Sequence, residues 1–263
     1  MTFSTRSLSL LLGLFLIGTP VLQAQWTPPN AAPTFPRTLL KTSELPDLRA
    51  HLLPEPAHGL CLGLWNSVQS YGVPTSLPSS DGQRRKAAFN AKNASFFYLL
   101  DRKPLAGGTL VTLTAAESVS LRDKAIALLE LQNTQVESFP QVDPYLWRSN
   151  QLINNVIAYD LLKGAAVPDS LLQTGRTLLM DMSASLYAQV KNDFFGLGFF
   201  SFHVNNHALR TCGALGMAGL VLSDEAATSS NRDPEAWFQL ALFQIDEVLW
   251  RSSNSQSTPG VVA

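Results

Sequence analysis

Helical periodicity is the feature that most constrains this chain. From Arg37 onward, apolar residues recur three and four positions apart, and short clusters of Pro, Gly, Ser, Thr or Asp interrupt the pattern. This pattern predicts about eight helices with short connections, near residues 42–53, 58–71, 82–100, 114–131, 144–164, 167–191, 203–222 and 233–250. The segment 109–114 (TLVTLT) could form a strand, but it is short and isolated. We therefore predict an all-α fold.

Helix-start signals mark several of these boundaries. Thr42 or Ser43 is expected to cap the first helix, and Thr114 with Glu117 has the spacing of a capping box. Pro144 is expected to begin another helix. Successive antiparallel helices with short loops form αα-hairpins, which stack into an open solenoid or a closed α/α toroid. The chain has no clean repeat at a fixed period, so an α/α toroid, as an incomplete barrel of antiparallel helical hairpins, is preferred.

The N-terminal residues indicate export. Arg6 precedes an apolar run at 8–18 (LSLLLGLFLIG), and Ala24 suits the position before a cleavage site. The alternative is an uncleaved anchor, but the run is shorter than the roughly 20 apolar residues that a membrane span needs. We predict a signal peptide at 1–24, a proline-rich leader at 25–36 and a periplasmic or secreted domain at 37–263, with no membrane span after cleavage.

Composition limits the possible ligands. A formal net charge of −1 argues against non-specific binding of nucleic acid, which needs a dense basic surface. It leaves room for an acidic ligand, because a local basic groove can exist within a neutral total. The two cysteines, Cys61 and Cys212, lie far apart in apolar contexts and could either pair or remain separate buried thiols.

Residues 193–218 (DFFGLGFFSFHVNNHALRTCGALGMA) carry the richest chemistry. Asn206, His207 and Arg210 cluster near the start of a helix, and the small residues that follow require another helix to pack closely. A purely structural alternative has Asn206 capping the helix and His207 bonding within the core. His203 and His207 stand four residues apart, but no third ligand accompanies them, so we predict no metal and no cofactor.

Three segments together resemble one enzyme family. The N-N-H run followed by a small-residue helix is similar to the active-site helix of the alginate-lyase and heparinase II/III-like polysaccharide lyases. The segment FPRTLLKTSELPDLRAHLL resembles the opening of that family, and WRSNQLINNVIAYDLL resembles its inner helix ending in A-Y-D-L-L. The resemblance extends in order over residues 36–250. It implies an N-terminal α/α toroid followed by a β-sandwich domain.

The resemblance also implies β-elimination at a uronic acid in a polysaccharide such as alginate or a glycosaminoglycan-like chain. Asn206 would neutralise the sugar carboxylate, and His207 would act as base. The Tyr that protonates the leaving oxygen in this family lies downstream of the Asn-His helix, and the sequence to Ala263 includes neither this Tyr nor the β-sandwich. We therefore expect a partial catalytic set, with little or no activity from this stretch alone.

Other polar and aromatic residues are candidates for binding the acidic polysaccharide. Aromatic faces stack on sugar rings and cations bind carboxylates, so the predicted substrate-binding residues are Arg210, Asn205, Trp147, Arg148, Asn150 and His203. Trp147 could instead belong to the core, and Arg210 could pair with an acid. The run Arg84-Arg85-Lys86 is expected to be a solvated face, whereas Tyr159 should pack and Asp160 should pair near a helix end.

Two rival functions remain open. A glycoside hydrolase on an α/α barrel would need two facing carboxylates, for which Asp143, Asp160 and Asp193 are candidates. A non-catalytic carbohydrate-binding domain of helical hairpins would bind sugar whether or not His207 is present.

Overall fold

The computed structural model describes residues 34–132, 144–195 and 206–254, with only the backbone described for 144–146, 192–195, 206–208 and 247–254. The chain divides into two units, Met1–Ala32 and Pro33–Ala263. All described elements belong to the second unit. The predicted signal peptide lies outside the described residues.

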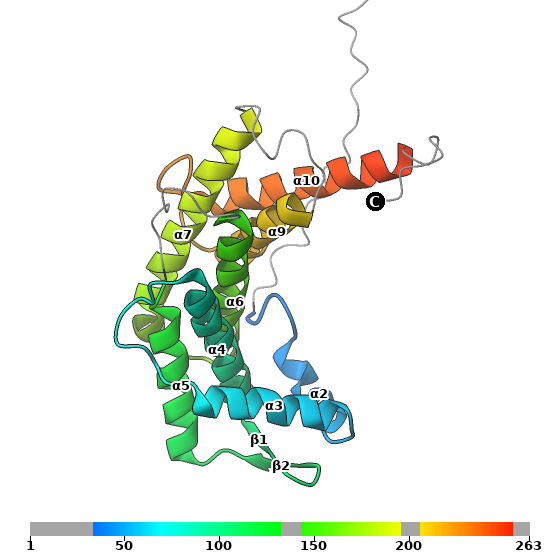
Figure 1. The fold of residues 1–263 in the computed structure, drawn as a ribbon, viewed down its shortest axis with the longest axis vertical. Helices are drawn as coiled ribbons and strands as arrows, with labels where there is room; N and C mark the ends of the chain where they lie inside the picture. Colours follow the sequence, from blue (N-terminus) through cyan, green and yellow to red (C-terminus); the bar gives the residue numbers. More distant parts are fainter. Residues whose placement is uncertain (1–33, 133–143, 196–205, 255–263) are drawn as a thin grey trace, which may run out of the picture. The chain divides into compact units, whose positions relative to one another are not determined.

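The described part is predominantly helical (Figure 1), which confirms the all-α prediction. It contains eight α-helices, one 3-10 helix and one β-hairpin. In chain order these are η1 (Thr42–Glu44), α2 (Leu45–His51), α3 (Ala57–Ser70), α4 (Asp81–Leu100), β1 (Arg102–Leu105), β2 (Thr109–Thr112), α5 (Ala115–Leu129), α6 (Pro144–Gly164), α7 (Asp169–Phe195), α9 (Asn206–Val221) and α10 (Pro234–Asn254).

The structure confirms one of the predicted helix caps and contradicts another. Thr114 and Glu117 form the predicted capping box at the start of α5. Hydrogen bonds from Lys103 and Thr114 hold the pKa of Glu117 down at about 2. The expected cap at Thr42 or Ser43 is wrong, because both residues lie inside η1 and α2 begins only at Leu45.

The segment read as an isolated strand is half of a hairpin. Strand β2 pairs antiparallel with β1, and Gly107 and Gly108 make the turn at φ of 91° and 82°. Such positive φ values suit glycine, which has no Cβ. The sequence hid β1 because RKPL contains a proline and no apolar alternation. Both ring nitrogens of buried His58 contact carbonyl oxygens, of Leu52 and Leu105, and so connect α3 to the hairpin.

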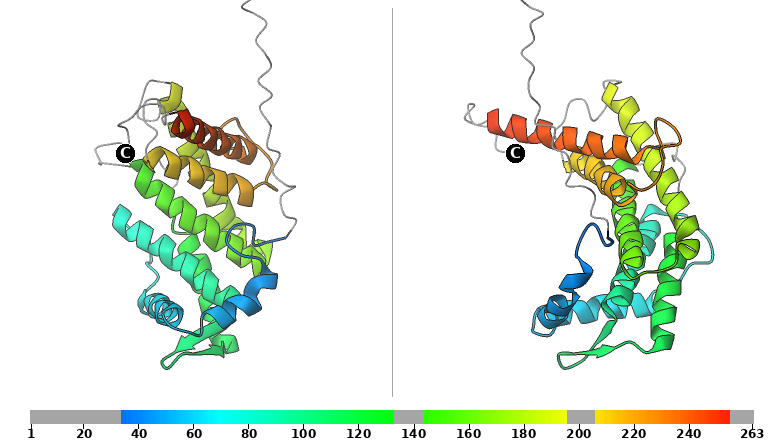
Figure 2. Two further views of the ribbon diagram at one scale, coloured as in Figure 1. Left: turned by 90° about the vertical axis from the view of Figure 1, so that its right-hand side faces the viewer. Right: turned by 180° about the vertical axis from the view of Figure 1, so that it is seen from behind.

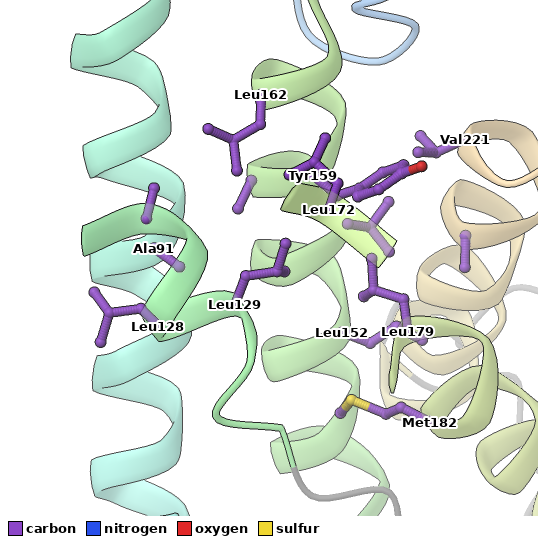
Figure 3. Close-up of a cluster of buried hydrophobic side chains, with 14 of the residues drawn as sticks. Ala91, Leu128, Leu129, Leu152, Tyr159, Leu162, Leu172, Leu179, Met182 and Val221 are labelled. Atoms are coloured by element: carbon purple, nitrogen blue, oxygen red, sulfur yellow. The ribbon is translucent and has the colours of Figure 1, made fainter. Parts of the chain in front are cut away.

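Helices α4, α6 and α9 lie side by side and form a central layer (Figure 2). They run in the same direction: Arg85 meets Trp147 near their starts, and Leu99 packs with Leu161 and Met217 near their ends. The flanking helices α5, α7 and α10 pack against α4, α6 and α9 respectively. Figure 3 shows the core between α4, α5, α6, α7 and α9, where side chains such as Leu129, Tyr159 and Leu179 meet.

The far end of α6 is joined to the N-terminal segment, residues 35–38, through Asp160. This carboxylate is fully buried and accepts hydrogen bonds from the backbone N–H of Arg37 (2.7 Å) and Thr38 (2.9 Å) and from the Thr38 hydroxyl (2.6 Å). Burial raises the pKa of Asp160, although these hydrogen bonds act in the opposite direction. The expected pairing of Asp160 is confirmed, and its partner is the N-terminal segment.

Arg37 extends this junction to α9. Its guanidinium, only 3% exposed, donates to the carbonyl oxygens of Leu220 and Val221 at the end of α9 and pairs with Asp224 at 2.6 Å. A cation at a helix C-terminus satisfies carbonyls that have no partner inside the helix and complements the helix dipole. We call Asp160, Arg37 and Thr38 the latch, because together they fix the ends of α6 and α9 to one segment.

We expect Asp160→Ala to lower the free energy of unfolding by about 3 kcal/mol, because it leaves two partly buried backbone N–H donors and the Thr38 hydroxyl without their acceptor. Urea denaturation followed by circular dichroism would measure the change. Asp123→Ala is the matched control. That carboxylate is largely exposed and pairs only with neighbouring Arg122, so its loss should cost less than about 0.5 kcal/mol. Equal effects of the two substitutions would contradict the role given to the latch.

Candidate functional site

The first turns of α6 contact three other helices. Consecutive residues of an α-helix point about 100° apart, so Trp147, Arg148, Ser149 and Asn150 cover most of the helix circumference. Trp147 contacts α4, Arg148 contacts α7, and Ser149 and Asn150 both contact α9. The start of α6 is therefore the point where α4, α7 and α9 are held together.

Trp147 contacts α4. The guanidinium carbon of Arg85 lies over the Trp147 ring, 3.4 Å from its centroid, and both side chains are half-buried. The Nε atom of Arg85 is buried and makes no hydrogen bond within the described part of the chain. Stacking on the indole is therefore what fixes this guanidinium.

Arg148 lies inside the fold and contacts α7. It is 6% exposed and donates to the side-chain oxygens of Gln189 (3.0 Å) and Ser185 (3.3 Å). This placement gives Arg148 a structural role between α6 and α7. It does not put Arg148 among the side chains that a polymer could reach.

Two contacts join α6 to the start of α9. The buried Ser149 hydroxyl donates to the Thr211 hydroxyl at 2.9 Å, and Arg210 donates to the side-chain oxygen of Asn150. Arg210 is exposed and Asn150 is half-buried. The structure therefore brings together Arg210 and Asn150, two of the predicted substrate-binding residues.

Asn206 and His207 are the first two residues of α9. Their backbone stands one turn before Arg210, at the end of the central layer where α4 and α6 also begin. Their side chains lie outside the described part of the structure, as do His203 and Asn205.

Charge is unevenly divided between the central layer and the flanking helices. Helices α4, α6 and α9 carry seven Lys or Arg residues and two Asp residues, whereas α5, α7 and α10 carry five Lys or Arg and eight Asp or Glu. Both acids of the central layer are engaged, Asp81 with Arg84 and Asp160 in the latch. A chain of formal net charge −1 therefore contains a basic layer.

One side of the central layer carries polar and aromatic residues that are at least partly accessible. On α4, Arg85, Phe89 and Lys92 follow the i, i+4, i+7 spacing of a single helix face. Lys92 lies over the Phe89 ring, 4.8 Å from its centroid, and burial lowers the pKa of Lys92. With Trp147, Asn150 and Arg210, these residues form what we call the open face.

Residues 40 and 45, which follow the N-terminal segment, cover the other half of this side. Leu40 and Leu45 pack on a small apolar cluster of Leu99, Ile157 and Leu161, which continues the same helix faces toward the latch. The open face is therefore the part of the central layer nearest to the helix starts. Helix starts carry a partial positive charge, which adds to that of the basic residues.

The α4 residues of this face were not predicted as binding residues. The run Arg84-Arg85-Lys86 was expected to be a solvated face, and this is wrong for Arg84. Arg84 is only 8% exposed and donates to the carbonyl of Pro78. Residues 85, 89 and 92 follow a helix spacing that could have indicated a shared face. The contact between this face of α4 and Trp147 of α6 could be recognised only in the structure.

The described residues also bear on the cysteines, on metal ligands and on the carboxylates considered for hydrolysis. Cys61 and Cys212 are both buried and free, so they do not pair. No group of three His, Cys, Asp or Glu side chains in the described ranges could hold a metal ion. No helix of the described part is long and apolar enough to cross a membrane. Of the three carboxylates considered for hydrolysis, Asp160 is bound in the latch, and the side chains of Asp143 and Asp193 lie outside the described residues.

Comparisons with known proteins add no relative. No protein-family model matches the chain, and neither the curated proteins nor the solved structures include a significant match.

Helix α9 is held in place by close contact with α10, as its small residues predict. A Cβ added at Gly219 would collide with the Pro234 carbonyl and the Phe238 backbone, and one at Gly216 would collide with Ala241. Gly213, on the same helix, has open space around it. A larger side chain can therefore be accommodated at Gly213 but not at Gly216 or Gly219 without movement of α10.

We expect Gly219→Ala to lower the free energy of unfolding by about 1–3 kcal/mol, because the colliding atoms belong to the backbone. Gly213→Ala is the matched control and should be neutral, or stabilising by up to about 1 kcal/mol, since alanine favours helix more than glycine. Thermal or urea unfolding would compare the two variants. Similar effects at both positions would contradict the close α9–α10 contact.

Proposed function

We propose that this protein is a polysaccharide lyase that cleaves a uronate-containing polymer, such as alginate or a glycosaminoglycan-like chain, by β-elimination. We further propose that the described helices are part of an α/α toroid. In this proposal the open face binds the polymer and the start of α9 carries the reacting groups.

The helix arrangement supports the toroid proposal. Helices α4, α6 and α9 run in the same direction in one layer, and α5 and α7 lie on the side of that layer opposite the N-terminal segment (Figure 2). Arg148 near the start of α6 meets Gln189 near the end of α7, so these two helices are antiparallel. Repeated antiparallel hairpins with all first helices in one layer are the building plan of an α/α toroid.

The basic central layer is the observation that carries the functional proposal. A polymer of uronic acids has one carboxylate on each sugar, and a surface rich in Lys and Arg attracts such a chain along its length. Arg210 and Asn150 lie beside the start of α9, where the resemblance places the reacting pair. The three helix starts at the same end add partial positive charge.

The residues at the start of α9 fit the chemistry of β-elimination. The reaction removes the proton at C5 of the uronate and expels the 4-linked oxygen, and negative charge develops on the carboxylate. The amide of Asn206 can donate a hydrogen bond to that carboxylate without titrating, which stabilises the developing charge. His207 is a base whose ordinary pKa lies near neutrality, so it can accept the C5 proton.

The three segments that resemble the lyase family are also connected to one another. Arg37 and Thr38 belong to the first segment and bind Asp160 of the second, and Arg37 reaches the end of α9, the helix of the third. A shared network is a physical reason for these segments to occur together in one chain. It also assigns the first segment and A-Y-D-L-L a structural role rather than a catalytic one.

The test incubates the protein with polymannuronate, polyguluronate or heparan sulfate and measures the formation of unsaturated uronate ends. The absorbance of the new C4–C5 double bond reports this product. We expect unsaturated product whose formation depends on the base at the start of α9. His207→Ala should reduce the rate by about 10²–10⁴-fold, the usual contribution of a positioned base.

His51→Ala is the control for loss of a histidine. His51 lies on α2, and its ring contacts only the Asp47 carbonyl, so the rate should not change. Product formation that survives in His207→Ala would contradict the role of the base. Binding of the polymers with no product, unaffected by His207→Ala, would favour the carbohydrate-binding alternative instead.

A further inference from the structure

The pair formed by Arg85 and Trp147 is the most specific feature of the open face. We propose that Arg85 binds the carboxylate of a uronate unit away from the cleavage point, and that Trp147 positions Arg85 rather than stacking on sugar. This inference rests on the proposed function for the identity of the polymer. It assigns a new binding residue and changes the role expected for Trp147.

The stacking geometry determines what each side chain can do. The guanidinium of Arg85 lies 3.4 Å from the Trp147 ring centroid, so it covers one face of the indole. A pyranose ring cannot occupy the same face at the same time. The flat guanidinium, in contrast, keeps N–H donors in its plane, and these can bind both oxygens of a carboxylate.

Most arginines of the described residues pair with an acid, whereas the two of the open face have other partners. Six arginines of the described residues form ion pairs with Asp or Glu, namely Arg37, Arg84, Arg102, Arg122, Arg176 and Arg232. Within the same residues, Arg85 has an aromatic partner and Arg210 an amide partner. Arg49 donates to the backbone carbonyl of Leu100, and Arg148 is buried. The two arginines of the open face therefore carry a charge that no acid among their described contacts compensates.

Position separates Arg85 from the reacting groups. Arg85 is on α4 and Asn206 is on α9, with α6 between them. Neighbouring helices pack about 8–10 Å apart, so two such spacings place the α4 site roughly 16–20 Å from the start of α9. One sugar cannot reach both places, but an oligomer that lies across the helix starts can. Contact with Arg85 should therefore depend on oligomer length.

Lys92 strengthens the same region. It lies on the α4 face that carries Arg85 and Phe89, two turns further along the helix. A polymer that crosses α4 thus meets two cations, and the helices of the central layer have no carboxylate other than Asp81 and Asp160. This separation of charge favours an anionic polymer over a neutral one.

The experiment measures binding of mannuronate oligomers of increasing length to the full chain by calorimetry. Loss of a charge-assisted hydrogen bond should weaken binding by about tenfold or more, so Arg85→Gln should raise the Kd of a long oligomer by that factor. The Kd of a disaccharide should not change. Arg85→Lys should recover only part of the loss, because a lysine ammonium lacks the planar fork.

Double substitution tests the positioning role of Trp147. Trp147→Ala should weaken long-oligomer binding nearly as much as Arg85→Gln, and the double variant should lose little more, because the two residues act as one unit. Trp147→Phe, which keeps an aromatic face, should retain most of the affinity. Arg122→Gln is the charge-matched control on flanking helix α5, and it should bind like the parent chain.

The inference would be overturned by unchanged long-oligomer binding in Arg85→Gln, by an equal loss at all oligomer lengths, or by equal binding of a carboxyl-reduced neutral oligomer. Tighter binding of dextran sulfate than of mannuronate oligomers would show that Arg85 recognises a sulfate ester rather than a carboxylate. This result would also overturn the inference. Unfolding midpoints of every variant would show whether a loss of binding reflects loss of fold.

The inference and the proposed function can fail separately. If the Arg85 variants show the length-dependent loss but no variant yields unsaturated product, the carboxylate site stands and the lyase proposal fails. If product forms and depends on His207 while Arg85→Gln binds like the parent chain, the lyase proposal stands and the Arg85 inference fails.

Discussion

Helix α6 is buried along most of its length, and it supplies a polar side chain to each group of elements packed against its two ends. Near its start, Arg148 holds α7, Ser149 and Asn150 hold α9, and Trp147 receives Arg85 of α4. Near its end, Asp160 binds the N-terminal segment. Buried polar groups cost free energy unless they are paired, so these contacts specify which helix lies beside which part of α6. The apolar core alone would not fix those positions so closely.

Fixing the helices in this way also determines where charge accumulates. Because α4, α6 and α9 run in the same direction, their starts meet at one end of the central layer, and Arg85, Arg148 and Arg210 lie near those starts. The flanking helices carry most of the carboxylates. A chain that is nearly neutral overall can therefore still have a basic surface. How its charges divide between the two groups of helices depends on the order of the helices along the chain. An acidic polymer would bind across helix starts rather than along one helix.

The sequence predicted the helices well because their signals are local. The Thr114–Glu117 capping box, Pro144 and the apolar spacing each act within a few residues. The hairpin strand β1 and the partner of Asp160 escaped prediction because they depend on residues distant in the sequence. At the site, Arg210 and Asn150 were proposed separately and prove to be in contact, whereas Arg85 was assigned to solvent. Its contact with Trp147 joins two helices, and no local pattern encodes such a contact.

We propose above all that an acidic polysaccharide binds the open face of the central layer. Hydroxyl-radical footprinting with and without a long mannuronate oligomer tests this most directly, because it reports side-chain accessibility residue by residue. Oxidation of Phe89 and Trp147 should fall when the oligomer is present, while Phe243 of α10, which is 45% exposed, should react as before. Protection of Phe243 with no change at Phe89 and Trp147 would contradict the account.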